Sequence, residues 1–329
     1  MNKIIIAFLA GSTVLLGGCA RQQLNPDMIM DQAEQPELTN VSYASLASLP
    51  YTDNSIKLHY GADTLQYGRL YLPPTAQNQP QTKTPLLVFI HGGCWLNAYD
   101  ISHSRAFSQA VASAGFAVWS VEYRRTGDEG GGWPGTFDDI LQALHYSQIA
   151  FDAYAVDSKN IALAGHSAGG QLALLAAGRS YLQYDYLQNA NVQNGNLHRE
   201  TDPLPQIKGV IGLAAITDIL AYAEGANSCQ RATRQFLGGT ATEQLASYQQ
   251  ANPRQQIMHP ATLLLHGSVD TIVPLAQATT SDMPYKLVAD AGHFDWIHPH
   301  TRAYKQFIAS LQELLHSDNS EPFIKKQSD

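Results

Sequence analysis

The sequence predicts an α/β fold in which a mostly parallel sheet carries helices on both faces. From about residue 85 onward, short apolar runs alternate with stretches of helical periodicity, which is typical of parallel strands joined by crossover helices. The run 85–90 (Pro-Leu-Leu-Val-Phe-Ile) is apolar throughout, as expected for a central strand that is buried on both faces. A chain of 329 residues with 44% hydrophobic content is long enough for one large domain of this class.

The other elements follow from the same patterns. Residues 55–60 and 65–72 alternate with period two, which predicts a leading antiparallel hairpin. An amphipathic helix is expected over 302–315, at the end of the fold. Further strands are expected at 115–125, 160–164, 210–215, 261–265 and 285–288.

One short motif carries a chemical prediction. Residues 165–169 read Gly-His-Ser-Ala-Gly and lie between an expected strand and an expected helix. The two glycines permit a very sharp turn, in which Ser167 is held in a strained conformation with its hydroxyl exposed. Because a serine is a weak nucleophile on its own, the motif needs a base and an acid.

Candidates for both follow later strands. Asp270 comes after the strand at 261–265, and His293 comes after the strand at 285–288. The chain order Ser, Asp, His is that of α/β-hydrolases, and the chain resembles their esterase/lipase branch. The resemblance implies that Ser167 attacks a carbonyl carbon, His293 acts as the base, and Asp270 orients the imidazole.

Other residues remain candidates for the same roles. Asp218 follows the apolar run 210–215 and is an alternative acid. His298 and His300 are alternatives to His293, although their position suggests the start of the last helix.

The strand at 85–90 leads into His-Gly-Gly-Cys-Trp, which resembles the HGGG-type oxyanion loop of lipases and esterases. The form with tryptophan at the fifth position is more similar to kynurenine formamidase-like and related esterases. This resemblance implies that the N–H groups of Gly93 and Cys94, helped by the turn at Gly92, and that of Ala168 bind the developing oxyanion.

The loop after the strand at 115–125 is rich in glycine. Arg124 and Arg125 have acidic neighbours, so we expect ion pairs that hold this loop against the core. Trp95 and Trp133 are expected to wall the substrate pocket, and aromatic walls would suit an apolar substrate.

Two segments interrupt the alternation, at 181–205 and 218–253. In hydrolases of this type the second position commonly holds a cap, so a small helical cap is expected there. Tyr222 and Phe236 are expected to pack this cap on the core, with pocket lining as the alternative. Cys94 and Cys229 are either a disulfide or free thiols.

The N-terminus predicts export. Lys3 precedes an apolar stretch that is too short to span a membrane comfortably, and the chain then reads Leu-Gly-Gly-Cys. This resembles a bacterial lipoprotein signal, which implies a signal peptide over 1–18 and a lipid on Cys19, with a plain signal peptide as the alternative. Alanine rather than aspartate after the cysteine favours the outer membrane.

The expected organisation is therefore a flexible tether over 19–48, a hydrolase domain over 49–316 and a polar tail over 317–329. The net charge of −8 and the lack of a basic run argue against a nucleic-acid partner. Neither a metal-ligand spacing nor a dinucleotide motif occurs, so no cofactor is expected.

The leading hypothesis is a lipid-anchored serine hydrolase that cleaves a small carboxylic ester or amide. An arylformamidase is the alternative within the same chemistry. A catalytically silent hydrolase fold that serves as a surface binding protein is the alternative from another class.

Overall fold

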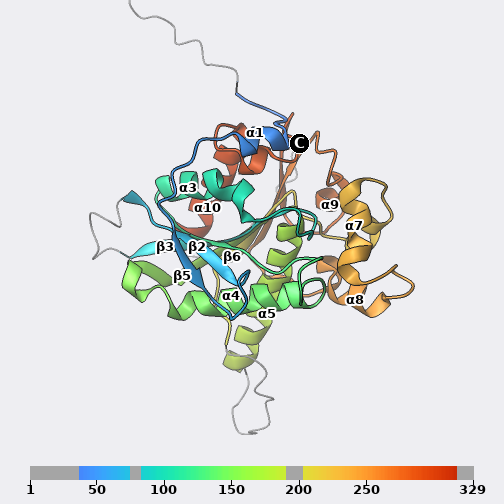
Figure 1. Ribbon diagram of the computed structural model, residues 1–329, viewed down its shortest axis with the longest axis horizontal. Helices are drawn as coiled ribbons and strands as arrows, with labels where there is room; N and C mark the ends of the chain where they lie inside the picture. The colour runs from blue at the N-terminus through green and yellow to red at the C-terminus, as the bar shows by residue number, and fades with distance from the viewer. Residues whose placement is uncertain (1–36, 75–82, 190–202, 317–329) are drawn as a thin grey trace, which may run out of the picture. The chain divides into compact units, whose positions relative to one another are not determined.

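The computed structural model describes residues 37–74, 83–189 and 203–316 (Figure 1). The expected signal peptide, Cys19, the tether as far as residue 36 and the tail over 317–329 lie outside the described residues. None of the described helices has the length and apolar character needed to cross a bilayer.

An eight-stranded sheet forms the centre of the described chain, in the order β1-β2-β4-β3-β5-β6-β7-β8. The first two pairings in this order are antiparallel and the other five are parallel. The predicted hairpin and the predicted parallel sheet are therefore both confirmed. The strands are β1 (Ile56–His59), β2 (Tyr67–Tyr71), β3 (Thr84–Ile90), β4 (Ala117–Val121), β5 (Val156–His166), β6 (Gly209–Leu213), β7 (Thr262–Gly267) and β8 (Tyr285–Val288).

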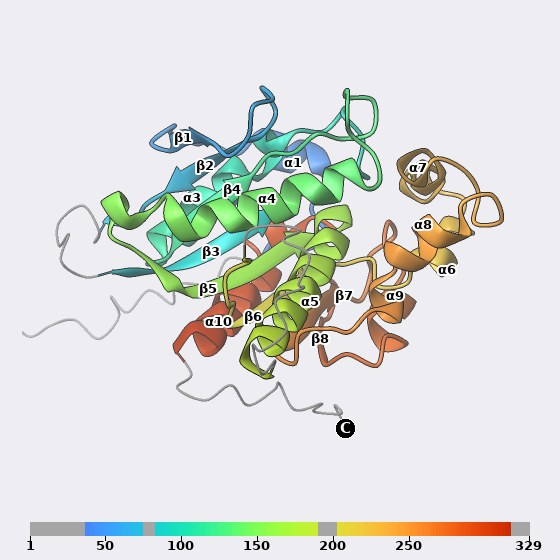
Figure 2. The same cartoon turned by 90° about the horizontal axis from the view of Figure 1, so that it is seen from below.

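Helices cover both faces of the sheet (Figure 2). Side chains of α3 (Arg105–Ser113) and α10 (Arg302–His316) belong to one buried apolar cluster, and those of α4 (Gly135–Ile149) and α5 (Ala168–Asn189) belong to the other. The apolar residues of α10 recur every three or four positions, so a single stripe of that helix is buried. The other described helices are α1 (Tyr43–Ala47), η2 (Ile101–Ser104), η3 (Asp152–Tyr154), α6 (Ile219–Ala223), α7 (Ser228–Leu237), α8 (Leu245–Gln250), η4 (Pro253–Gln255), α9 (Ala276–Thr279) and η5 (Asp295–Ile297).

The segment expected to form a cap is helical, as predicted. Helices α6, α7 and α8 gather beside one end of α5 (Figure 2). Helix α7 starts with a reciprocal capping box between Asn227 and Gln230, and it ends at Gly238, whose φ of 81° suits a residue without Cβ. Tyr222 and Phe236 are each 1% exposed, so both pack the cap on the core.

The expected tether is wrong for residues 37–48. This stretch contains α1 and pairs with the C-terminal part of the domain through a bridge between Leu38 and Thr301. Its polar composition suggested a solvated linker, but Leu46 is 3% exposed and belongs to the core. The folded domain therefore includes residues 37–48, which the sequence assigned to the tether.

Candidate active site

Ser167 occupies the sharp turn between β5 and α5. Its φ is 56°, in the left-handed region that costs a residue with a side chain about 1 kcal/mol. The turn is held by a hydrogen bond in which the Ser167 N–H donates to the Leu213 carbonyl at 2.8 Å. This backbone strain at a serine is what the G-x-S-x-G motif predicts.

The two outer glycines of the motif are required by close backbone approach. A Cβ atom at Gly165 would lie 2.1 Å from the Gly169 carbonyl oxygen. A Cβ atom at Gly169 would lie 2.3 Å from the carbonyl oxygens of both Ile90 and His91. The turn therefore packs directly against the end of β3, where the oxyanion loop begins.

The structure brings the predicted base and acid together. Nδ1 of His293 lies 2.7 Å from Oδ2 of Asp270, and the two side chains are 4% and 0% exposed. Oδ1 of Asp270 accepts hydrogen bonds from the N–H groups of Ile272 and Val273 at 2.8 and 2.9 Å. Burial alone would raise the pKa of Asp270. The His293 imidazole and the hydrogen bonds lower it by more than burial raises it, so the pKa lies below its ordinary value. The carboxylate is therefore ionised and fixed in orientation.

Asp218, the alternative acid, binds groups away from His293. Asp218 is the N-cap of α6, where its carboxylate accepts a hydrogen bond from the Ala221 N–H at 3.1 Å. It also accepts a hydrogen bond from Asn252 at 3.2 Å and contacts Arg254 at 3.5 Å. Its described contacts thus include neither His293 nor the turn at Ser167.

The rival bases lie between η5 and α10, just before the last helix, close to where their sequence position suggested. The rings of His298 and His300 contact each other at 5.7 Å, and Nδ1 of His298 accepts a hydrogen bond from the His300 N–H. It is His293 that meets the buried carboxylate of Asp270.

The neighbour of the serine ties the two loops to each other. Nε2 of His166 donates to the carbonyl oxygen of His293 at 2.9 Å, and the two rings lie 4.6 Å apart. Burial holds the pKa of His166 well below its ordinary value, so the ring is neutral. The loop that carries His293 is thereby fixed to the turn that carries Ser167.

The predicted oxyanion loop lies beside the serine. A Cβ atom at Gly92 would lie 3.2 Å from Cβ of Ser167 and 2.8 Å from the His166 carbonyl oxygen. Gly93, Cys94 and Trp95 have φ values of 114°, 55° and 58°. Successive amides in such conformations can form an anion-binding concavity, and Ala168 adds an N–H at the N-terminus of α5.

A buried polar network under this loop was missed from the sequence. Glu122, at the end of β4, is 0% exposed and lies 3.1 Å from Nε2 of His91. It also accepts a hydrogen bond from the Ile101 N–H and lies 3.4 Å from the Arg125 guanidinium. Burial raises the pKa of Glu122, but His91 and Arg125 lower it more, so the net direction is downward. The glutamate directly after an apolar strand was the sequence signal that could have indicated this network.

The ion pairs predicted for the next loop are confirmed. Arg124 binds Asp139 with two nitrogens, at 2.9 and 2.6 Å, and Asp139 is buried. Arg125 is 4% exposed and pairs with Asp128 at 3.3 Å. Both pairs hold the glycine-rich loop on the body of the protein.

The oxyanion loop is also joined to the cap. Cys94 and Cys229 form a disulfide with a Cα–Cα distance of 5.0 Å, so the alternative of a free Cys94 thiol is wrong. The Trp95 ring stacks on Phe236 at 4.8 Å, and its indole N–H donates to Gln171 at 3.0 Å. One covalent and one aromatic contact thus hold α7 over the loop.

The two tryptophans differ in their access to solvent. Trp95 is 0% exposed, and its surface is used in protein contacts, so it supports the loop and does not present a face to an open pocket. Trp133 is half-buried between Phe137 and Phe236, with ring distances of 5.4 and 6.1 Å. Of the two, Trp133 remains the candidate for a pocket wall. Among the described residues, no group of three or more histidine, cysteine or acidic side chains could hold a metal ion.

The sheet order, the strained serine and the loops around it define the α/β-hydrolase fold. Residues 69–283 match the BD-FAE family model, which is more than half of the chain, and the chain belongs to that family. Solved structures agree on the fold. Esterase B from Lactobacillus Rhamnosis superimposes with a TM-score of 0.65 at 18% identity, covering 83% of this chain and 89% of that one. A bacterial heroin esterase gives a TM-score of 0.60 at 20% identity, covering 83% and 88%.

Relatives of known name are esterases too, in agreement with the class of enzyme that the motifs predict. Esterase LipC of Mycobacterium tuberculosis is 24% identical over 282 residues, which are 82% of this chain and 66% of that protein. Ethyl acetate hydrolase of Pseudomonas putida is 32% identical over 111 residues, 33% of each chain. This chain thus spans from about a third to about two thirds of the length of these two relatives.

Proposed function

We propose that this protein is a carboxylic ester hydrolase that works through an acyl-enzyme, with Ser167, His293 and Asp270 as its catalytic residues. The observation that carries the proposal is the 2.7 Å contact between His293 and the buried carboxylate of Asp270, in a loop fixed to the turn of Ser167. The named esterases among its relatives support the same chemistry.

Each group has a defined task in this mechanism. Asp270 keeps the proton of His293 on Nδ1, so Nε2 is free to take the proton of the Ser167 hydroxyl. The hydroxyl oxygen then attacks the ester carbonyl, and a tetrahedral oxyanion forms. His293 returns the proton to the departing alcohol, and water repeats the sequence on the acyl-enzyme.

The oxyanion would be bound by backbone amides. The N–H groups of Gly93, Cys94 and Ala168 are the proposed donors, and Gly92 lets their loop approach the serine. One donor of this kind typically lowers the barrier by about 3 kcal/mol. Because the disulfide and the Trp95 stack fix the loop before substrate arrives, little reorganisation is needed.

The test is an ester panel with wild type and Ser167→Ala. We expect wild type to hydrolyse p-nitrophenyl acetate and butyrate. The kcat of Ser167→Ala should be lower by at least about 1,000-fold. N-formylkynurenine in the same panel tests the arylformamidase alternative, which predicts that the formamide is the better substrate. Equal rates for wild type and variant would point instead to a silent binding protein.

We also propose, from the sequence alone, that the chain is exported and anchored to the bacterial envelope by a lipid on Cys19. Several acyl chains give stable attachment, since burial is worth about 0.8 kcal/mol per CH₂. We expect Cys19→Ser to move the protein from the membrane fraction to the soluble fraction. A variant that stays membrane-bound would contradict the lipid anchor.

A further inference from the structure

The N-terminal arm, defined as residues 37–49, docks beside the loop that carries His293. The Asp295 side chain is buried and accepts hydrogen bonds from the N–H groups of Asn40 and Val41 at 2.8 and 2.7 Å. On the same loop, a Cβ atom at Gly292 would lie 2.3 Å from Oδ1 of Asn40. The arm and the His293 loop therefore fix each other on both sides of the histidine.

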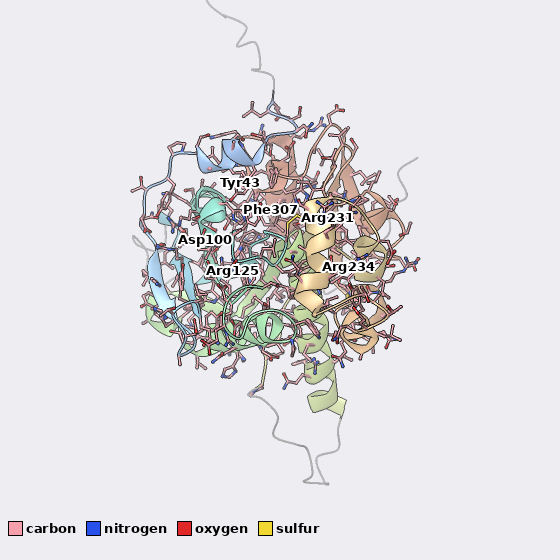
Figure 3. The ribbon with its side chains drawn as sticks, turned by 45° about the vertical axis from the view of Figure 1, so that its right-hand side comes forward. Tyr43, Asp100, Arg125, Arg231, Arg234 and Phe307 are labelled. Carbon is pink, nitrogen blue, oxygen red and sulfur yellow. A yellow bond between two sulfur atoms is a disulfide. The ribbon has the colours of Figure 1, made fainter. Side chains whose placement is uncertain are left out.

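Tyr43, the first residue of α1, is labelled in Figure 3. It touches both loops of the candidate active site. Its ring lies 5.6 Å from that of Phe294, which contacts the His293 ring at 5.0 Å. It also lies 5.7 Å from the Tyr99 ring, and Tyr99 occupies the space that a side chain at Gly93 would need. One ring of the arm thus bridges the base loop and the oxyanion loop.

These three rings present accessible aromatic surface beside the loops that carry His293 and Gly93. Tyr43 is 37% exposed, and Tyr99 and Phe294 are half-buried. Aromatic faces gathered in this way bind planar or apolar groups. A substrate held by Ser167 would therefore meet them with whichever of its groups extends past His293.

The helix of the arm is only partly packed on the domain. Leu46 is the only buried residue of α1, and residues of the arm and of the segment 102–106 line a cavity of about 230 Å³. Because packing beneath α1 is incomplete, Asp295, Tyr43 and Leu46 contribute to the position of the arm, together with the bridge at Leu38. Single substitutions at the first two can therefore test its role.

We propose that the arm is part of the substrate-binding site of the enzyme, with Tyr43 as a specificity-determining residue for the planar or apolar group of the ester. Asp295 is the positioning residue that fixes the arm beside His293. This inference rests on the proposed catalytic role of His293. It extends the site to a segment that the sequence assigned to a linker.

The first experiment compares Tyr43→Ala and Tyr43→Phe in the full chain, with p-nitrophenyl acetate and p-nitrophenyl benzoate as substrates. Tyr43→Ala should lower kcat/KM about tenfold for the benzoate, mainly through KM, and less than about twofold for the acetate. Tyr43→Phe keeps the ring and should stay near wild type. Ile149→Ala, which truncates a 65% exposed apolar side chain at the end of α4, outside the arm, is the control and should leave both substrates unchanged.

Unchanged selectivity in Tyr43→Ala, or an equal loss for both esters, would overturn the role of Tyr43. Either result would leave the proposed function intact, because Ser167-dependent hydrolysis of the acetate is measured in the same assay. Absence of that hydrolysis in wild type would instead refute the proposed function.

The second experiment tests Asp295 with Asp295→Asn, which keeps an acceptor oxygen, and Asp295→Ala, which does not. Both should speed hydrogen exchange at the Asn40 and Val41 amides and lower kcat/KM for the benzoate, with the larger effects in Asp295→Ala. If Asp295→Ala fails to fold, Asp295→Asn alone carries the test. Faster exchange of both amides with unchanged kinetics on the benzoate would show that the arm has only a structural role.

Discussion

Replacing Asp270 by asparagine isolates the role of the acid. The amide oxygen of an asparagine would keep the two N–H donors of Ile272 and Val273, which bind Oδ1 at 2.8 and 2.9 Å. The NH₂ group would then face Nδ1 of His293, where Oδ2 now lies at 2.7 Å. An imidazole that accepts at Nδ1 carries its proton on Nε2, so it cannot take the proton of Ser167. We expect Asp270→Asn to lower kcat about 10⁴-fold, which corresponds to an activation barrier higher by about 5 kcal/mol.

The matched control is Asp218→Asn, because asparagine caps a helix as well as aspartate does. It should change kcat by less than about twofold. The assay is steady-state hydrolysis of p-nitrophenyl butyrate, with urea unfolding to verify that both variants fold. A larger loss in Asp218→Asn, or more than a tenth of wild-type kcat in Asp270→Asn, would refute the assignment of the acid.

Three further predictions concern stability and the oxyanion loop. Burial lowers the pKa of His103 and of His259 from 6.5 to about 4. Between pH 6.5 and 4 the unfolded chain therefore binds more protons than the folded chain. The free energy of unfolding should fall on acidification over this range, by at most on the order of 3 kcal/mol per histidine. Urea titrations at several pH values measure this, and a pH-independent free energy would contradict it. Cys229→Ser should lower the free energy of unfolding by about 2–5 kcal/mol, because it removes the disulfide to Cys94. A reducing agent should then have no further effect on the variant. Equal free energies of unfolding for wild type and Cys229→Ser would count against this. Gly92→Ala should lower kcat at least about 100-fold, because its Cβ would push the loop away from the serine; near-normal turnover would argue that the loop binds no oxyanion.

The sharp turn at Ser167 was predictable because its physical requirements are local. A turn that leaves no room for Cβ at Gly165 and Gly169 needs glycine there, and this leaves a readable signature. The ends of the strands before Ser167 and Asp270 are apolar because both faces of the sheet are buried there, whereas β8, before His293, is a half-exposed edge strand. Asp270 and His293 could be proposed from their position after strands, although only the structure shows that their side chains meet.

Features that depend on distant contacts were not predictable. The arm was assigned to a linker because its composition is polar, whereas it docks through backbone N–H groups that bind Asp295, 254 and 255 residues away. Every residue except proline has a backbone N–H group, so contacts made by these groups leave no pattern in the sequence. The disulfide was left open for a similar reason, since a separation of 135 residues does not say whether two cysteines meet.

The most direct measurement is the intact mass of the protein after treatment with a fluorophosphonate. Such a probe reacts with a serine only when a base activates it and an oxyanion site receives the phosphonyl oxygen. Wild type should gain one adduct at Ser167 and lose esterase activity in proportion, whereas Ser167→Ala should gain none. Folded wild type that stays unlabelled, or a labelled Ser167→Ala protein, would contradict the mechanism.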